Sequence, residues 1–156
     1  MTCPIAGYRI DEKAARVVAG FVLLGTLLGL FLPAAGARGV FLFLALDFAT
    51  RGFSRPRWSP LGRLAGLILR ALSIAAAPVD AGPKRFAARI GLAFSLSLLA
   101  LAGTAAPTAT FFVGGVLAFC AALESFVGVC LGCRAWTLWY DVLDRFRQPS
   151  ASSREA

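Results

Sequence analysis

The chain has 156 residues, of which 58% are apolar and only 15% are charged, and its formal net charge is +8. A soluble domain of this length has too little interior to hide that much apolar surface, so the composition excludes an ordinary soluble domain and predicts a polytopic membrane protein. The basic residues flank apolar segments and no motif interleaves them with aromatic residues, so nucleic acid is not an expected partner.

The first two apolar segments follow a short polar head. They cover about residues 14–32 and 35–50, and Pro33 separates them. Asp47 lies inside the second segment and Arg51 follows four residues later, so the two side chains share one face of a helix and can pair. Because ionisable groups at membrane depth are usually functional or paired, Asp47 is either a functional carboxylate or an interfacial one that Arg51 neutralises.

A basic stretch with several prolines separates the two halves of the chain. Within it, residues 61–77 place Arg63 and Arg70 on one helical face and apolar side chains on the rest, which predicts an amphipathic helix in the membrane interface. Its role is either contact with anionic lipid or simple packing. The chain then returns to the membrane through a polar turn that supplies further candidates for substrate binding or charge pairing, namely Asp80, Lys84 and Arg85.

Two more apolar segments follow, at about residues 86–106 and 108–130. An amphipathic continuation of the fourth segment is expected to run to about Arg147, and residues 149–156 to form a disordered cytoplasmic tail. The sequence therefore predicts an all-α integral membrane protein with one membrane domain over residues 1–148. This domain has four transmembrane helices in two hairpins plus one interfacial amphipathic helix.

The distribution of charge orients the predicted spans. With four spans, the head, the central basic stretch and the tail lie on one side of the membrane and hold 15 of the 16 cationic residues, whereas the opposite side keeps only Arg38. The positive-inside rule assigns the basic side to the cytoplasm. Both termini are therefore expected on the cytoplasmic side, where thiols stay reduced.

The candidate site lies at the cytoplasmic end of the fourth segment. Cys130 and Cys133 are placed there, and Cys3 belongs to the same side of the membrane, so three thiols can meet at one face. Glu124 lies deeper in the same segment. Its carboxylate can exchange a proton with a thiol or pair with Arg51.

The Cys-x-x-Cys pair has several chemical interpretations. It can form a disulfide, carry a persulfide, or supply two ligands to a metal. Because the chain has no histidine, a metal would need thiolates from Cys3, Cys130 and Cys133 plus a fourth ligand, and no other cofactor is predicted. The alternative without chemistry is that these cysteines are small apolar residues near a helix end. Cys120, deep in the segment, is expected to be inert packing.

Several motifs resemble those of one known family. They are Cys3-Pro4, the sequence DFATR that ends at Arg51, PLG after Trp58, DAGPKRFA from Asp80, and Leu123-Glu124 leading to CLGC. Over about residues 3–140 the chain resembles the membrane family catalogued as domain of unknown function 4395. The resemblance implies a bacterial inner-membrane protein of about four spans with no established activity. Relatives tend to accompany rhodanese-like or thioredoxin-like proteins, which implies a partner of that kind and favours thiol or sulfur chemistry.

The preferred interpretation is a thiol protein that handles reducing equivalents or sulfane sulfur at the cytoplasmic face. Cys130 and Cys133 are the expected exchanging pair, and Cys3 is the third thiol. The carboxylates of Glu124 and Asp47 are expected to donate and accept protons at the site. The cations Arg51 and Lys84 are expected to attract a thiolate or a sulfur oxyanion.

Two other functions stay open from the sequence. One is a small transport or channel subunit in which Asp47, Arg51 and Glu124 line a polar path. The other is a non-catalytic assembly protein. Whether the chain is an enzyme is left undecided.

Overall fold

The computed structural model describes residues 9–54, 58–104 and 106–147. Helices dominate this part of the chain, as predicted. The elements in chain order are β1 (Arg9–Asp11), α1 (Glu12–Phe31), α2 (Ala34–Phe53), α3 (Pro60–Ala71), β2 (Pro78–Asp80), α4 (Ala81–Leu101), α5 (Pro107–Ala122), the π-helical turn η2 (Leu123–Val127) and α6 (Leu131–Arg147).

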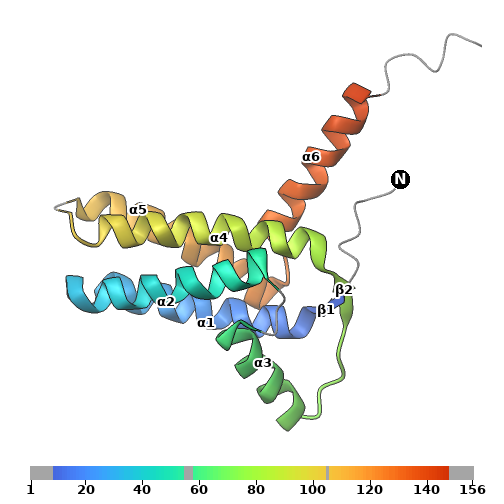
Figure 1. Ribbon diagram of the computed structural model, residues 1–156, viewed down its shortest axis with the longest axis horizontal. Helices are drawn as coiled ribbons and strands as arrows, with labels where there is room; N and C mark the ends of the chain where they lie inside the picture. The colour runs from blue at the N-terminus through green and yellow to red at the C-terminus, as the bar shows by residue number, and fades with distance from the viewer. Residues whose placement is uncertain (1–8, 55–57, 105, 148–156) are drawn as a thin grey trace, which may run out of the picture.

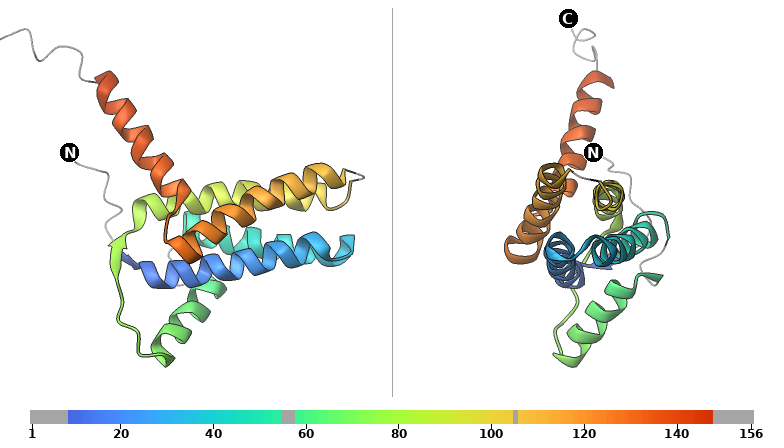
Figure 2. Two further views of the ribbon diagram at one scale, coloured as in Figure 1. Left: turned by 180° about the vertical axis from the view of Figure 1, so that it is seen from behind. Right: turned by 90° about the vertical axis from the view of Figure 1, so that its left-hand side faces the viewer.

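Four long helices form a bundle of two hairpins, α1–α2 and α4–α5 (Figures 1 and 2). Between the hairpins, α2 packs along α4 and α1 along α5. The end-on view in Figure 2 shows these four rods grouped together, while α3 and α6 leave the bundle in opposite directions. The predicted helices near residues 14–32, 35–50, 86–106 and 108–130 correspond to α1, α2, α4 and α5 with η2.

A two-stranded antiparallel sheet, not predicted from the sequence, joins the starts of the two hairpins. Strands β1 and β2 pair with Arg9 opposite Asp80 and Asp11 opposite Pro78, and the amide of Glu12 donates to the carbonyl of Ala77 at 2.9 Å. Each strand leads directly into a helix, β1 into α1 and β2 into α4. The sheet therefore ties the segment that leads into α1 to the segment that leads into α4.

The prediction of one interfacial helix over 61–77 was too long. Ser59 caps the start of α3, because its hydroxyl accepts the amide of Gly62 at 2.9 Å, but the helix ends at Ala71. Ser73 then has a positive φ of 52°, which stops the helix. Residues 74–77 carry no helix because the chain must extend to reach β2.

The fourth apolar segment was wrongly expected to continue as one helix through Cys130 to Arg147. It loosens into the π-helical turn η2, and the chain leaves the helix at Gly128 with φ of 76°. The amides of Gly128 and Val129 both donate to the carbonyl of Leu123, the pattern of a helix end with glycine in the left-handed conformation. α6 then starts anew at Leu131 and projects away from the bundle (Figure 1).

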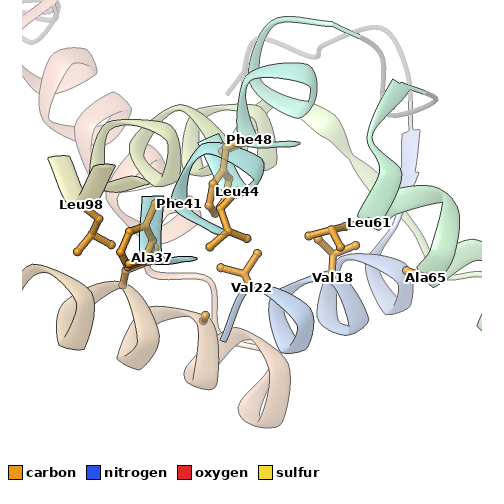
Figure 3. Packing of buried hydrophobic residues seen from close by; sticks show 12 residues of the cluster. Val18, Val22, Ala37, Phe41, Leu44, Phe48, Leu61, Ala65 and Leu98 are labelled. Atoms are coloured by element: carbon orange, nitrogen blue, oxygen red, sulfur yellow. The ribbon is translucent and has the colours of Figure 1, made fainter. Parts of the chain in front are cut away.

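Close approaches at glycine let large side chains fill the core. Figure 3 shows Phe41, Leu44 and Phe48 of α2 inside the bundle, with Val22 of α1 facing them. Gly91 of α4 leaves the space that the ring of Phe48 occupies, since a Cβ at that position would overlap the ring. The tight fit fixes the register of α2 against α4, which matters for the site because both helices carry its charged residues.

The outer surface of the bundle is more apolar than parts of its interior. Phe31 is 78% exposed and Phe112 is 73% exposed, whereas Thr26 and Ser95 are fully buried. Within the described residues, two helices are long and apolar enough to cross a membrane, Glu12–Phe31 and Pro107–Val127. The structure therefore supports a helical protein with two candidate membrane spans.

Candidate functional site

The break between η2 and α6 places Cys130 at the N-terminal end of α6. The carbonyl of Cys130 accepts the first helical hydrogen bond, from the amide of Arg134 at 3.1 Å. Its thiol Sγ lies 3.4 Å from the amide nitrogen of Cys133, which donates to it. Cys130 therefore occupies the capping position, where the free amides and the dipole of a helix stabilise a negative charge.

The two thiols have opposite electrostatic situations. A hydrogen bond from the Cys133 thiol lowers the pKa of Cys130, and the amide of Cys133 and the charge of Lys84 act in the same direction against burial and Glu124. The same hydrogen bond raises the pKa of Cys133, because that thiol must keep its proton to donate it. Since the thiolate is the nucleophilic form of cysteine, this environment favours Cys130 over Cys133 as a nucleophile.

The start of α6 is held against α4. Gly132, between the two cysteines, lies so close to Ala87 that an added Cβ would come within 2.7 Å of the Ala87 Cβ. One turn further, the rings of Phe86 and Trp136 meet with centroids 5.0 Å apart. A glycine inside the Cys-x-x-Cys is thus required for contact between α6 and α4, and this contact brings the cysteines to the helix that carries Lys84.

Glu124 forms an ion pair with Lys84 rather than with Arg51. The Lys84 Nζ lies 2.7 Å from the Glu124 Oε1, and both side chains are largely buried, at 16% and 20% exposure. From the sequence, pairing with Arg51 was one of two expectations for Glu124, the other being proton exchange with a thiol. The π-helical turn brings Glu124 to the first turn of α4, where Lys84 is nearer.

A small cavity of about 90 Å³ lies beside the cysteine pair, between α1, α2, α4 and α5. Apolar residues make most of its wall, and its polar side chains are Arg51, Glu124, Cys120 and Cys130. Cys120 was expected to be inert packing, but it lies on the same cavity as Cys130. Its spacing of one helical turn from Glu124 was the signal in the sequence that could have indicated this.

The pairing of Asp47 with Arg51, predicted from their spacing, is confirmed. Their side chains approach to 2.8 Å, and the carboxylate is completely buried. Its other oxygen accepts from the hydroxyl of Ser59 at 2.6 Å and from the amide of Leu61 at 3.2 Å. Asp47 therefore fixes the start of α3 to α2, and Ser59 is a partner that sequence reasoning missed.

Two other predicted site residues serve helix ends in the structure. Asp80 caps α4, because its carboxylate accepts the amide of Gly82 at 2.7 Å. Arg85 donates to the carbonyl of Phe53 at the end of α2, at 3.3 Å. Arg85 also lines a second cavity, together with Lys84 and Arg51.

The structure brings together Cys130, Cys133, Glu124 and Lys84, with Arg51 on the shared cavity. Cys3 lies outside the described residues, and so does the predicted tail over 149–156. All three described cysteines, Cys120, Cys130 and Cys133, are free thiols. Within residues 9–54, 58–104 and 106–147, no group of three or more cysteine or acidic residues is arranged to hold a metal ion.

The fold and the site define a helical bundle with a dithiol at the N-terminus of its last helix. The chain belongs to the family described as domain of unknown function 4395, whose family model matches residues 10–140. The resemblance found in the sequence motifs is thereby confirmed. No curated protein and no solved structure matches the chain.

Proposed function

We propose that this protein carries out thiol exchange through Cys130 and Cys133 at the cytoplasmic face of a bacterial inner membrane. The observation that carries the proposal is the hydrogen bond from the Cys133 amide to the Cys130 Sγ at the start of α6. It gives one cysteine of the pair the environment of a nucleophile, and the neighbouring cavity gives a small reacting group access to that sulfur.

The first chemical step is attack of the Cys130 thiolate on a sulfur–sulfur bond. With a disulfide as substrate, the attack forms a mixed disulfide and releases one substrate thiolate, which takes a proton from solvent. The Cys133 thiol then loses its proton and displaces the second substrate thiolate. The substrate gains two electrons and two protons, and the protein is left with a Cys130–Cys133 disulfide.

Sulfane sulfur can enter by the same first step. The Cys130 thiolate attacks the outer sulfur of a donor persulfide. The bond between the two donor sulfurs breaks, the donor leaves as a thiolate, and Cys130 becomes a persulfide. An acceptor thiolate removes this sulfur and restores Cys130 without net oxidation. The cavity of about 90 Å³ suits a group as small as a single sulfur or a sulfur oxyanion.

Partners follow from the two cycles. A dithiol protein of the thioredoxin-like kind would reduce the Cys130–Cys133 disulfide, and a rhodanese-like protein would deliver a persulfide. α6 leaves the bundle immediately after the cysteines, so their side chains stay half-buried at the surface rather than at the centre of the bundle. We propose Glu124 and Lys84 as the groups that adjust the charge around the attacking sulfur.

We propose four membrane spans, α1, α2, α4 and α5 with η2. Support comes from helix lengths of 20, 20 and 21 residues for α1, α2 and α4 and from 21 residues over Pro107–Val127. Large apolar side chains are exposed on all four, including Leu28, Phe43, Leu96 and Phe112. A surface of this kind suits lipid rather than water.

Treatment of the purified protein with the aromatic disulfide 5,5′-dithiobis(2-nitrobenzoate) tests the proposal. In a Cys3→Ser/Cys120→Ser background, we expect release of two equivalents of the coloured thiol and formation of the Cys130–Cys133 disulfide, visible by mass spectrometry. With Cys133→Ser added, we expect release of one equivalent of the coloured thiol, and the other half of the reagent stays on Cys130 as a mixed disulfide. Equal, slow modification of both cysteines without disulfide formation would refute the exchange mechanism.

A transport function has one observation in its favour, since Arg51 and Glu124 share the wall of a cavity inside the bundle. Under this alternative, Glu124→Gln stops flux while cysteine variants retain it. Under thiol exchange the cysteine variants lose activity and Glu124→Gln only adjusts it. A non-catalytic assembly protein tolerates both changes.

A further inference from the structure

A second and larger cavity, of about 490 Å³, opens between the cytoplasmic ends proposed for α1, α3 and α4, beside β1. Its volume lies within the range of pockets that hold small molecules. A larger number of charged side chains distinguishes it from the cavity at the cysteines. Five cations and a single carboxylate line it, namely Arg9, Arg51, Arg70, Lys84, Arg85 and Asp11.

The cavity keeps an excess of positive charge. Arg51 is paired with Asp47 and Lys84 with Glu124, so three arginines remain against Asp11. In the described part of the chain, none of these three arginines forms an ion pair. Asp11 itself already accepts the amides of Lys13 at 3.0 Å and Ala77 at 3.1 Å.

The start of α4 carries cations where a helix disfavours them. Lys84 and Arg85 are among its first five residues, although the N-terminal end of a helix dipole is positive and repels cations. The Nε of Arg85 is also buried without a hydrogen-bond partner in the described residues. An anion in the cavity would relieve the repulsion and satisfy donors of this kind.

We propose that this cavity binds a phosphate group. Arginine forks match the oxygens of phosphate, and several of them converge here on the first turn of α4. Ile10 and Val18 add an apolar part to the wall, which suits the first methylene groups of the acyl chains of a phospholipid. Two sources share this chemistry, the headgroup of an anionic phospholipid and a soluble phosphate. The proposal is independent of the thiol function.

Thermal unfolding of the full chain in a neutral detergent tests the site and separates the two sources. The probes are phosphatidylglycerol, phosphatidylcholine, sodium phosphate, and sodium chloride at matched ionic strength. We expect a higher Tm with phosphatidylglycerol or with phosphate than with the phosphatidylcholine and chloride controls. Stabilisation by phosphatidylglycerol alone identifies a lipid site, and stabilisation by inorganic phosphate identifies a site that accepts soluble phosphate.

Matched variants localise the effect. Arg9→Gln and Arg70→Gln change exposed arginines at the cavity, and each should raise the half-saturating concentration about tenfold, the cost of one charge-assisted hydrogen bond. Arg63→Gln removes the same charge from α3 outside the cavity and should leave binding unchanged. Arg85→Gln provides a second cavity variant if one of the others fails to fold. Absence of any shift, or equal loss with Arg63→Gln, would overturn the proposal.

Discussion

Lys84 and Glu124 are 40 positions apart in the chain, yet their side chains meet at 2.7 Å. The pair joins the first turn of α4 to the π-helical turn that precedes the cysteines. Both charges act on the Cys130 thiol, Lys84 lowering its pKa and Glu124 raising it. One ion pair thus both positions the cysteine segment and sets the balance of charge around the Cys130 sulfur.

Neutralising the two members of this pair should move the reactivity of Cys130 in opposite directions. Lys84→Gln removes a charge that stabilises the thiolate, so the pH at which alkylation reaches half its maximal rate should rise. Glu124→Gln should lower that pH. Iodoacetamide labelling of Cys130 from pH 5 to 10, in a background without other cysteines except Cys133, measures both. Shifts in the same direction would show that the variants act through misfolding.

The hydrogen bond between the two thiols predicts a second pH effect. Because the Cys133 thiol lowers the pKa of Cys130, the wild-type alkylation profile should rise at a lower pH than that of an ordinary thiol. Cys133→Ala removes the donor and should move the profile to higher pH. Cys133→Ser keeps a hydroxyl donor and should move it less. An unchanged profile in Cys133→Ala would contradict the proposal that Cys130 is the attacking thiol.

Asp47 should be required for stability. Asp47→Ala leaves Arg51, the Ser59 hydroxyl and the Leu61 amide without their buried partner, and we expect a loss of about 3 kcal/mol in the free energy of unfolding. Reversible unfolding in mixed micelles measures it. The control is Glu12→Ala, which removes a more exposed pair with Arg16 and should cost less than about 1 kcal/mol.

Gly132→Ala should weaken the contact between α6 and α4. The new methyl group would lie within 2.9 Å of both the Cβ and the Cα of Ala87, so the backbone of one helix must shift, at a cost of about 1–3 kcal/mol. Alkylation of Cys130 should change as the cysteine segment moves away from Lys84. Gly66→Ala is the matched control, since a Cβ there meets nothing within 4 Å and should leave stability equal or slightly higher. Equal effects of the two variants would argue against tight packing at Gly132.

The helices and the Asp47–Arg51 pair were accessible from the sequence because both depend on local periodicity. Apolar runs interrupted by proline gave α1, α2, α4 and α5, and a spacing of four residues gave the ion pair. The resemblance to the family rested on short exact motifs, and the family model confirms it.

The errors arose where tertiary contacts override local pattern. The apolar character of the fourth segment continues past Gly128, so hydropathy alone hides the helix end that its positive φ creates. β1 and β2 are three residues each and lie far apart in the chain, and only their pairing makes them strands. The same holds for Lys84 and Glu124, whose contact depends on how two hairpins pack. Their partnership follows from the bundle and not from any spacing.

The small sheet sets one end of the bundle apart from the other. Because β1 runs straight into α1 and β2 into α4, backbone hydrogen bonds join the two hairpins at this end of the bundle. At the opposite end, beside the turns near Pro33 and Pro107, side chains link the hairpins instead, since the ring centroids of Phe31 and Phe111 lie 6.2 Å apart. The two ends of the bundle therefore differ in kind, because backbone hydrogen bonds join the hairpins at one end and side-chain packing joins them at the other. The Lys84–Glu124 pair lies at the end of the bundle that the sheet joins, so backbone pairing supports the contact between the hairpins there.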